Sequence, residues 1–129
     1  MAKFIENYFK LAAECAISEN DINKIRHFRL GCVGIRSDGA IVKSNNSSSI
    51  SPNRTIHAEY KLCRKMDKGG EIFVCRVKYN GGFYGMARPC ISCQKLIYSK
   101  NISKVYYTIN DTQYGIYFPK LDLDKVYNL

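Results

Sequence analysis

Two short stretches decide how the fold and function of this sequence are interpreted: "TIHAEYKLCRK" at residues 55–65 and "ARPCISCQKL" at residues 87–96. The first contains His57, with an acidic residue two positions later. The second contains Cys90 and Cys93, three positions apart and directly behind a proline. Imidazole and thiolate groups are common protein ligands of zinc, so the two stretches together predict a metal-centred site.

Each stretch on its own has a plainer explanation, because His-x-Glu is common in helices and Cys-x-x-Cys can be a pair of inert buried thiols. Cys90 and Cys93 are expected in the first turn of a helix, where both thiols share one face and the helix dipole favours thiolates. With His57 they make three zinc ligands and leave a fourth tetrahedral position open, as in catalytic zinc sites. A structural site closed by Cys63 or Cys75 is the alternative.

Glu59 separates the catalytic interpretation from the structural one. In an ideal helix, residues two apart point about 200° away from each other. His57 and Glu59 therefore share a target only if His57 lies at the helix entrance, and the Ser-rich loop expected at residues 45–54 allows this. Zinc lowers the pKa of water from 15.7 to about 7, and a carboxylate beside it can carry a proton to a leaving amine. The predicted chemistry is hydrolytic deamination, as at C4 of cytosine or C6 of adenine.

These motifs, in this order, resemble the zinc-dependent cytidine and deoxycytidylate deaminase superfamily, whose signature is His-x-Glu followed by Pro-Cys-x-x-Cys. The resemblance covers about residues 29–111 and extends to small phage-encoded deaminase-like proteins. It implies that His57, Cys90 and Cys93 hold Zn²⁺ and that Glu59 transfers protons.

The resemblance also implies contacts to a substrate. Members commonly have an asparagine after the second strand that touches the sugar, and either Asn45 or Asn46 fits. The backbone of Ala58 is usually a contact to the pyrimidine edge. Near the Pro-Cys, where many relatives have Ser, Thr or Glu, this chain has Ala87-Arg88. Arg88, or a Lys or Arg of the 43–54 loop, is a candidate phosphate contact. Tyr107 is a candidate for stacking a base.

The sequence around the motifs predicts an α/β fold, a three-layer α/β/α sandwich with one mixed sheet of about five strands and helices on both faces. One domain is expected over residues 1–129. The spacing of apolar residues and the turn signals, including Asp38-Gly39, predict helices near 4–16, 57–66 and 89–100 and strands near 29–36, 41–44, 71–79, 102–110 and 114–118. The short C-terminus favours an antiparallel final hairpin, as in the free-cytidine branch. That branch usually has Cys at the position of His57.

Composition narrows the partners. The chain has 129 residues, 46% of them hydrophobic, and a net charge of +9. Between positions 24 and 104 there are sixteen Lys and Arg but only four Asp and Glu. This excess of positive charge favours a phosphorylated or polyanionic partner, or else it only keeps the protein surface soluble. No apolar run is long enough to span a bilayer. The N-terminal segment is charged and unlike a signal peptide, which predicts a cytoplasmic protein. Six cysteines without an export signal argue against disulfides and predict buried thiols at Cys15, Cys32, Cys63 and Cys75.

Three functions remain open from the sequence. The first is deamination of cytosine to uracil on a free cytidine or deoxycytidine nucleoside or nucleotide. The second is deamination of cytosine or adenine within single-stranded DNA or RNA. The basic middle favours it, and so do aromatic residues that could stack bases if they are not core residues: Tyr79, Phe83, Tyr84, Tyr106 and Tyr107. The third is a non-catalytic domain stapled by zinc. Related enzymes are often dimers or tetramers, so the resemblance also implies a homo-oligomer.

Overall fold

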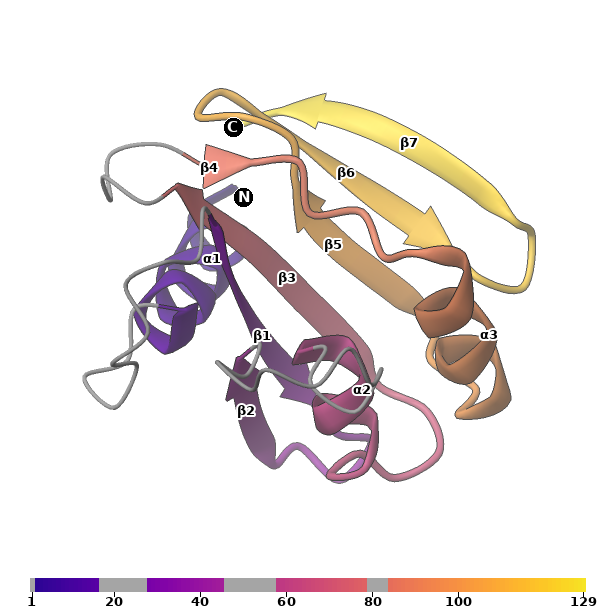
Figure 1. Ribbon diagram of the computed structural model, residues 1–129. Coiled ribbons are helices and arrows are strands. Elements are labelled where there is room, and N and C mark those ends of the chain that lie inside the picture. Colours follow the sequence, from indigo (N-terminus) through magenta and orange to yellow (C-terminus); the bar gives the residue numbers. More distant parts are fainter. Residues whose placement is uncertain (1, 17–27, 46–57, 79–83) are drawn as a thin grey trace.

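The computed structural model describes residues 2–16, 28–45, 58–78 and 84–129. At its centre lies one seven-stranded sheet with the order β2-β1-β3-β5-β6-β7, and β4 pairs with β3 (Figure 1). The strands are β1 (Phe28–Ile35), β2 (Ile41–Asn45), β3 (Glu71–Lys78), β4 (Tyr84–Gly85), β5 (Lys104–Thr108), β6 (Gln113–Phe118) and β7 (Leu123–Asn128). The sheet is mixed, because β3 and β5 run parallel while the other described pairs are antiparallel.

Helices cover both faces of this sheet. Helix α1 (Ala2–Ala16) lies on one face, and α2 (Ala58–Cys63) and α3 (Ile91–Ser99) lie on the other (Figure 1). The predicted α/β sandwich with a single mixed sheet and an antiparallel final hairpin is therefore confirmed. The predicted strand count was wrong, since the sheet has seven strands and not about five. No described helix is both long and apolar enough to cross a membrane.

Two hydrophobic clusters fill the space between the layers, and the central strand β3 contributes to both. Its side chains alternate: Ile72 and Val74 pack with α2 and α3, whereas Phe73 and Cys75 pack with α1. All four are fully buried, as expected for a strand covered on both faces. The two clusters therefore place α2 and α3, which carry the predicted site residues, on one side of the sheet.

Helix α1 packs tightly because β1 has glycine where the two meet. A Cβ atom at Gly31 would collide with the backbone oxygen of Ala12 and would lie 2.7 Å from the nitrogen of Ala16. Only glycine therefore allows this approach between helix and strand. The contact fixes the C-terminal end of α1, including Cys15, close to the edge of the sheet formed by β1 and β2.

The turns follow the sequence signals more closely than the helix ends do. Gly39 has φ 90° in the turn between β1 and β2, as its Asp-Gly signal predicts. Helix α2 ends at Cys63 and is shorter than predicted. The chain then turns, with Gly69 and Gly70 at φ 104° and 91°, before β3 begins. Met66 is still buried on the predicted side, so the apolar spacing continues past the end of the helix.

Candidate active site

The start of α2 is held against strand β2. Ser44 Oγ donates a hydrogen bond of 2.6 Å to the carbonyl oxygen of Ala58, the first residue of α2. His57 is the residue before this start and lies outside the described residues. Ala58 is fully buried, so the helix begins inside the protein and next to the sheet.

Glu59 lies in the first turn of α2 with only 4% of its surface exposed. Burial raises the pKa of its carboxyl group. Within the described ranges no lysine or arginine forms an ion pair with it, although an unpaired buried carboxylate is costly. Burial, and after it the negative charge of Glu59, raises the pKa of three nearby thiols: Cys32 on β1, Cys63 on α2 and Cys93 on α3. A buried acid of this kind, close to reactive groups, is typical of a functional site.

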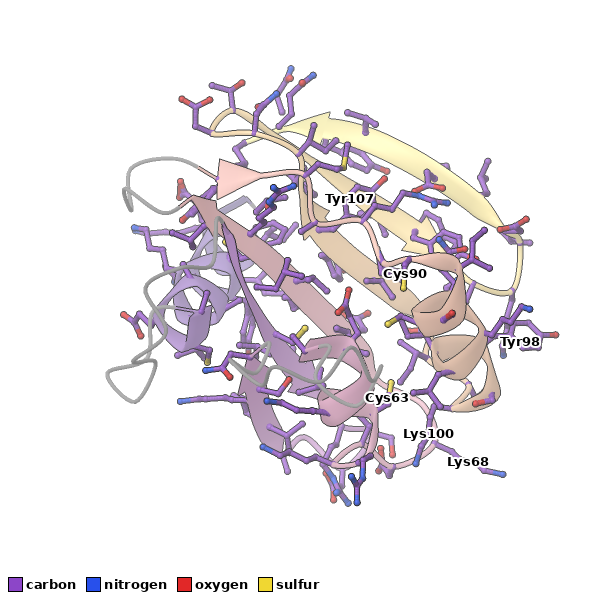
Figure 2. All side chains as sticks on the ribbon, viewed as in Figure 1. Cys63, Lys68, Cys90, Tyr98, Lys100 and Tyr107 are labelled. Carbon is purple, nitrogen blue, oxygen red and sulfur yellow. The ribbon has the colours of Figure 1, made fainter. Side chains whose placement is uncertain are left out.

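The two cysteines of the second motif lie together at the start of α3. Cys90 is the N-cap residue, exposed and with extended backbone angles, and Figure 2 shows it at the mouth of this helix. Cys93 is buried, and its side chain is hydrogen-bonded to that of Cys90. Burial is the largest cause that raises the pKa of Cys93, followed by the charge of Glu59. The pKa of Cys93 is therefore raised, opposite to the direction expected from the helix dipole.

The donor chemistry of this cluster fits zinc. Two adjacent thiols are soft ligands that zinc prefers, and a cation would offset the burial that keeps Cys93 protonated. No group of three His, Cys, Asp or Glu side chains that could hold a metal occurs in the part of the chain that the structure describes. The third predicted ligand, His57, is outside that part, so two of the three predicted ligands can be placed.

The remaining cysteines are mostly core residues, as predicted. Cys32, Cys63 and Cys75 are buried, whereas Cys15 is only half-buried. Cys75 belongs to the cluster under α1, on the opposite face from Cys93, so it cannot close a structural zinc site with the motif cysteines. Cys63 lies on the same side as Cys93 and is labelled at α2 in Figure 2. Burial raises its pKa to about 11.

Arg88, just before the second motif, forms an ion pair with the last strand, β7. Its Nε and Nη2 atoms each donate a hydrogen bond of 2.8 Å to the carboxylate of Asp124 on β7. The Tyr107 hydroxyl donates to the same carboxylate at 2.6 Å, and the guanidinium lies over the ring of Tyr117. Sequence reasoning missed Asp124, because it lies 36 positions from Arg88 in a segment without a motif. This network anchors the segment that leads into Cys90.

The other predicted substrate contacts are placed as follows. The Asn45 side chain donates to the Cys15 carbonyl at 2.9 Å, and Asn46 lies outside the described residues. Tyr107 is only 3% exposed, and Figure 2 shows it at β5 beneath the segment that precedes α3. Tyr106 is also buried and stacks on Phe73, while Tyr84 is half-buried. Tyr79 and Phe83 fall outside the described residues.

The Arg88–Asp124 pair should make stability depend on acid pH. Hydrogen bonds from Arg88, then from Tyr107, hold the pKa of Asp124 below its usual value. Their stabilisation is therefore complete above the unfolded pKa of about 3.9 and is lost as the pH falls through the folded pKa. We expect Asp124→Asn to lower the free energy of unfolding by about 1–2 kcal/mol at pH 7, allowing for solvent screening, and by less at pH 3.

Urea unfolding at the two pH values measures this difference. Asp111→Asn, at an exposed aspartate in the turn between β5 and β6, is the matched control and should change stability little. A cost of Asp124→Asn that is equal at pH 7 and pH 3 would show that the carboxylate charge does not stabilise the fold.

The family model described as "Cytidine and deoxycytidylate deaminase zinc-binding region" matches residues 3–109, and the chain belongs to this family. No curated protein sequence matches the chain.

Solved structures of similar fold include cytidine deaminase from Mycobacterium tuberculosis, with 18% identity and a TM-score of 0.56 over 81% of this chain and 83% of that one. Cytidine deaminase from Mycobacterium leprae is similar too, with 21% identity and a TM-score of 0.55 over 96% of this chain and 92% of that one. At these identities the likeness shows the fold alone.

Proposed function

We propose that this protein deaminates cytosine to uracil by zinc-dependent hydrolysis, on a free cytidine or deoxycytidine nucleoside or nucleotide. The observation that carries the proposal is the burial of Glu59 on α2, close enough for its charge to act on the thiol of Cys93 on α3. Family membership supports the same reaction, since the family is described by cytidine and deoxycytidylate deamination. The two solved neighbours are cytidine deaminases by name.

His57, Cys90 and Cys93 would hold the zinc ion. Zinc bound there would supply Lewis acidity, which lowers the pKa of water to about 7. Glu59 would then accept a proton at a carboxylate oxygen and donate it toward the base and the leaving amine. Burial suits this role, because it raises the pKa of Glu59 toward neutrality and keeps bulk water away from the proton.

Backbone and side-chain contacts at the start of α2 and the end of β2 would orient the substrate. Ser44 holds the carbonyl of Ala58. The N–H of Ala58, in the first helical turn, has no partner within the helix and would donate to the pyrimidine edge. Asn45 or Asn46 would contact the sugar. Arg88 would bind a phosphate only by releasing Asp124. The ring of Tyr107 is buried, so Tyr107 would contact a base only through the edge of that ring.

The alternatives are weaker but concrete. Deamination of cytosine or adenine within single-stranded DNA or RNA loses Tyr106 and Tyr107 as stacking residues, since both are core residues. A non-catalytic zinc staple would need a fourth protein ligand, for which Cys63 is the candidate. The cytoplasmic location, the homo-oligomer and the single domain stay proposals that rest on sequence and resemblance.

A product screen tests the proposal. The zinc-loaded protein is incubated with cytidine, deoxycytidine, their monophosphates, single-stranded DNA and single-stranded RNA, and the products are separated by chromatography. We expect uridine or deoxyuridine products from the free nucleosides or nucleotides. Conversion of the polynucleotides alone would favour the second function, and a zinc-loaded protein that converts none would support the staple.

A further inference from the structure

A hollow lies at the β2 edge of the sheet, and neither of the described zinc-ligand candidates, Cys90 and Cys93, lines it. It is open to solvent and has a volume of about 320 Å³. Its lining comes from four places in the chain: Cys15 on α1, Lys43, Ser44 and Asn45 on β2, Lys61 on α2, and Lys65 just after α2. Among the described residues that line it, three are lysines and none is acidic, so this part of the lining is positively charged.

The lysine side chains converge on one region. Lys65 Nζ donates a hydrogen bond of 2.6 Å to the backbone oxygen of Lys43, which draws its ammonium group across the edge strand. The charges of Lys43 and Lys65 both lower the pKa of Cys15, against the larger opposite effect of burial. Glu14 is the acid that acts on the same thiol, and it is exposed on α1 and does not line the hollow.

The hollow is a neighbour of the candidate active site through α2. Ser44, which lines the hollow, is hydrogen-bonded to Ala58, and Ala58 directly precedes Glu59. Glu59 and Lys61 are two residues apart and so point about 200° away from each other around the helix. One side of this short helix therefore carries the candidate catalytic acid, while the opposite side turns toward the lysines. The two sites are separated by about one helix diameter, roughly 10–12 Å.

We propose that Lys43, Lys61 and Lys65 bind a phosphate group of the substrate, as point charges around this hollow. The proposal rests on the proposed deaminase function and adds the chemical class that the substrate carries. The phosphate is that of a free nucleotide or that of the backbone of a single strand, which present the same anion. Arg88, one of the phosphate contacts suggested by sequence, is already paired with Asp124, whereas the described residues that line the hollow include no carboxylate.

The test measures binding of ligands that cannot react. The variant Lys43→Gln/Lys61→Gln/Lys65→Gln is compared with a control triple glutamine variant at exposed lysines outside the hollow: Lys3, Lys95 and Lys120. The probes are a fluorescent oligothymidylate, followed by anisotropy over a range of salt concentrations, and thymidine monophosphate, followed by calorimetry. Neither probe contains cytosine or adenine, so binding is scored without deamination.

For a single-stranded ligand, each lost phosphate contact reduces the slope of log K against log salt by about 0.7. We expect the hollow variant to lose about 2 in this slope and about tenfold or more in affinity at low salt, with the control near wild type. A triple arginine variant at the same positions should keep the binding, which separates lost charge from lost folding.

The two sources of phosphate are told apart by which probe is lost. Loss of oligothymidylate binding assigns the hollow to a nucleic-acid backbone, and loss of thymidine monophosphate binding alone assigns it to a free nucleotide. Equal binding by the hollow variant and the control, or no salt-dependent binding of either probe by the wild type, would overturn the proposal. Failure of the deaminase function would be seen separately, as no product from any cytosine substrate.

Discussion

Replacing Glu59 by glutamine is expected to lower kcat for deamination by about 10²–10⁴-fold while the zinc content stays at the wild-type level. Glutamine has nearly the same shape and would occupy the same buried position, of which 4% is exposed. Its amide cannot accept a proton and return it, so proton transfer is lost and binding of the metal is not. The measurement is kcat at saturating cytidine or deoxycytidine, with zinc determined on the same sample.

Glu14→Gln is the matched control, because Glu14 is an exposed acid on α1, on the far face of the sheet from Glu59. It should keep the wild-type kcat. Loss of zinc together with activity in Glu59→Gln would make Glu59 a metal ligand, and full activity without the carboxylate would remove it from the reaction.

The sequence predicted the parts of the fold in which local pattern and tertiary environment agree. Strand β3 is apolar on both faces and is covered on both faces, and Gly39 follows Asp38 in a tight turn. Strand β7 could not be predicted in this way, because most of its residues are exposed on either face and no alternation marks it. Its backbone pairing with β6 and the bonds of Asp124 to Arg88 and Tyr107 hold it in place.

The residues of the candidate site likewise include some that the sequence could predict and some that it could not. Glu59, Cys90 and Cys93 could be selected from sequence because few residue types bind zinc or transfer protons and their spacing is short. Asp124 could not be selected, since its partner is 36 positions away. The lysine hollow could be predicted only in part. The 43–54 segment, which contains Lys43, was a candidate phosphate contact, whereas Lys61 and Lys65 are brought beside it only when β2 and α2 pack.

Replacing Cys93 by serine is expected to weaken zinc binding by more than about 100-fold and to abolish deamination with it. Residues that only hydrogen-bond to metal ligands already change metal affinity by about 10–100-fold when mutated, and a direct thiolate ligand should matter more. The serine hydroxyl is a weaker zinc ligand than the thiolate. Because Cys93 is buried, close to Glu59 and hydrogen-bonded to Cys90, a solvent-exposed side chain could take its place as a ligand only if α3 moved. Zinc affinity is measured by competition with a chromogenic chelator.

Cys63→Ser is the matched control, because Cys63 is an equally buried thiol on the same side of the sheet. If zinc has three protein ligands and an open position, Cys63→Ser keeps the metal and the activity, and only the stability of the core falls. If Cys63 closes a structural site, it loses zinc as Cys93→Ser does. The pair of variants therefore decides whether Cys63 is the fourth ligand of a staple, because a catalytic centre keeps its fourth position open.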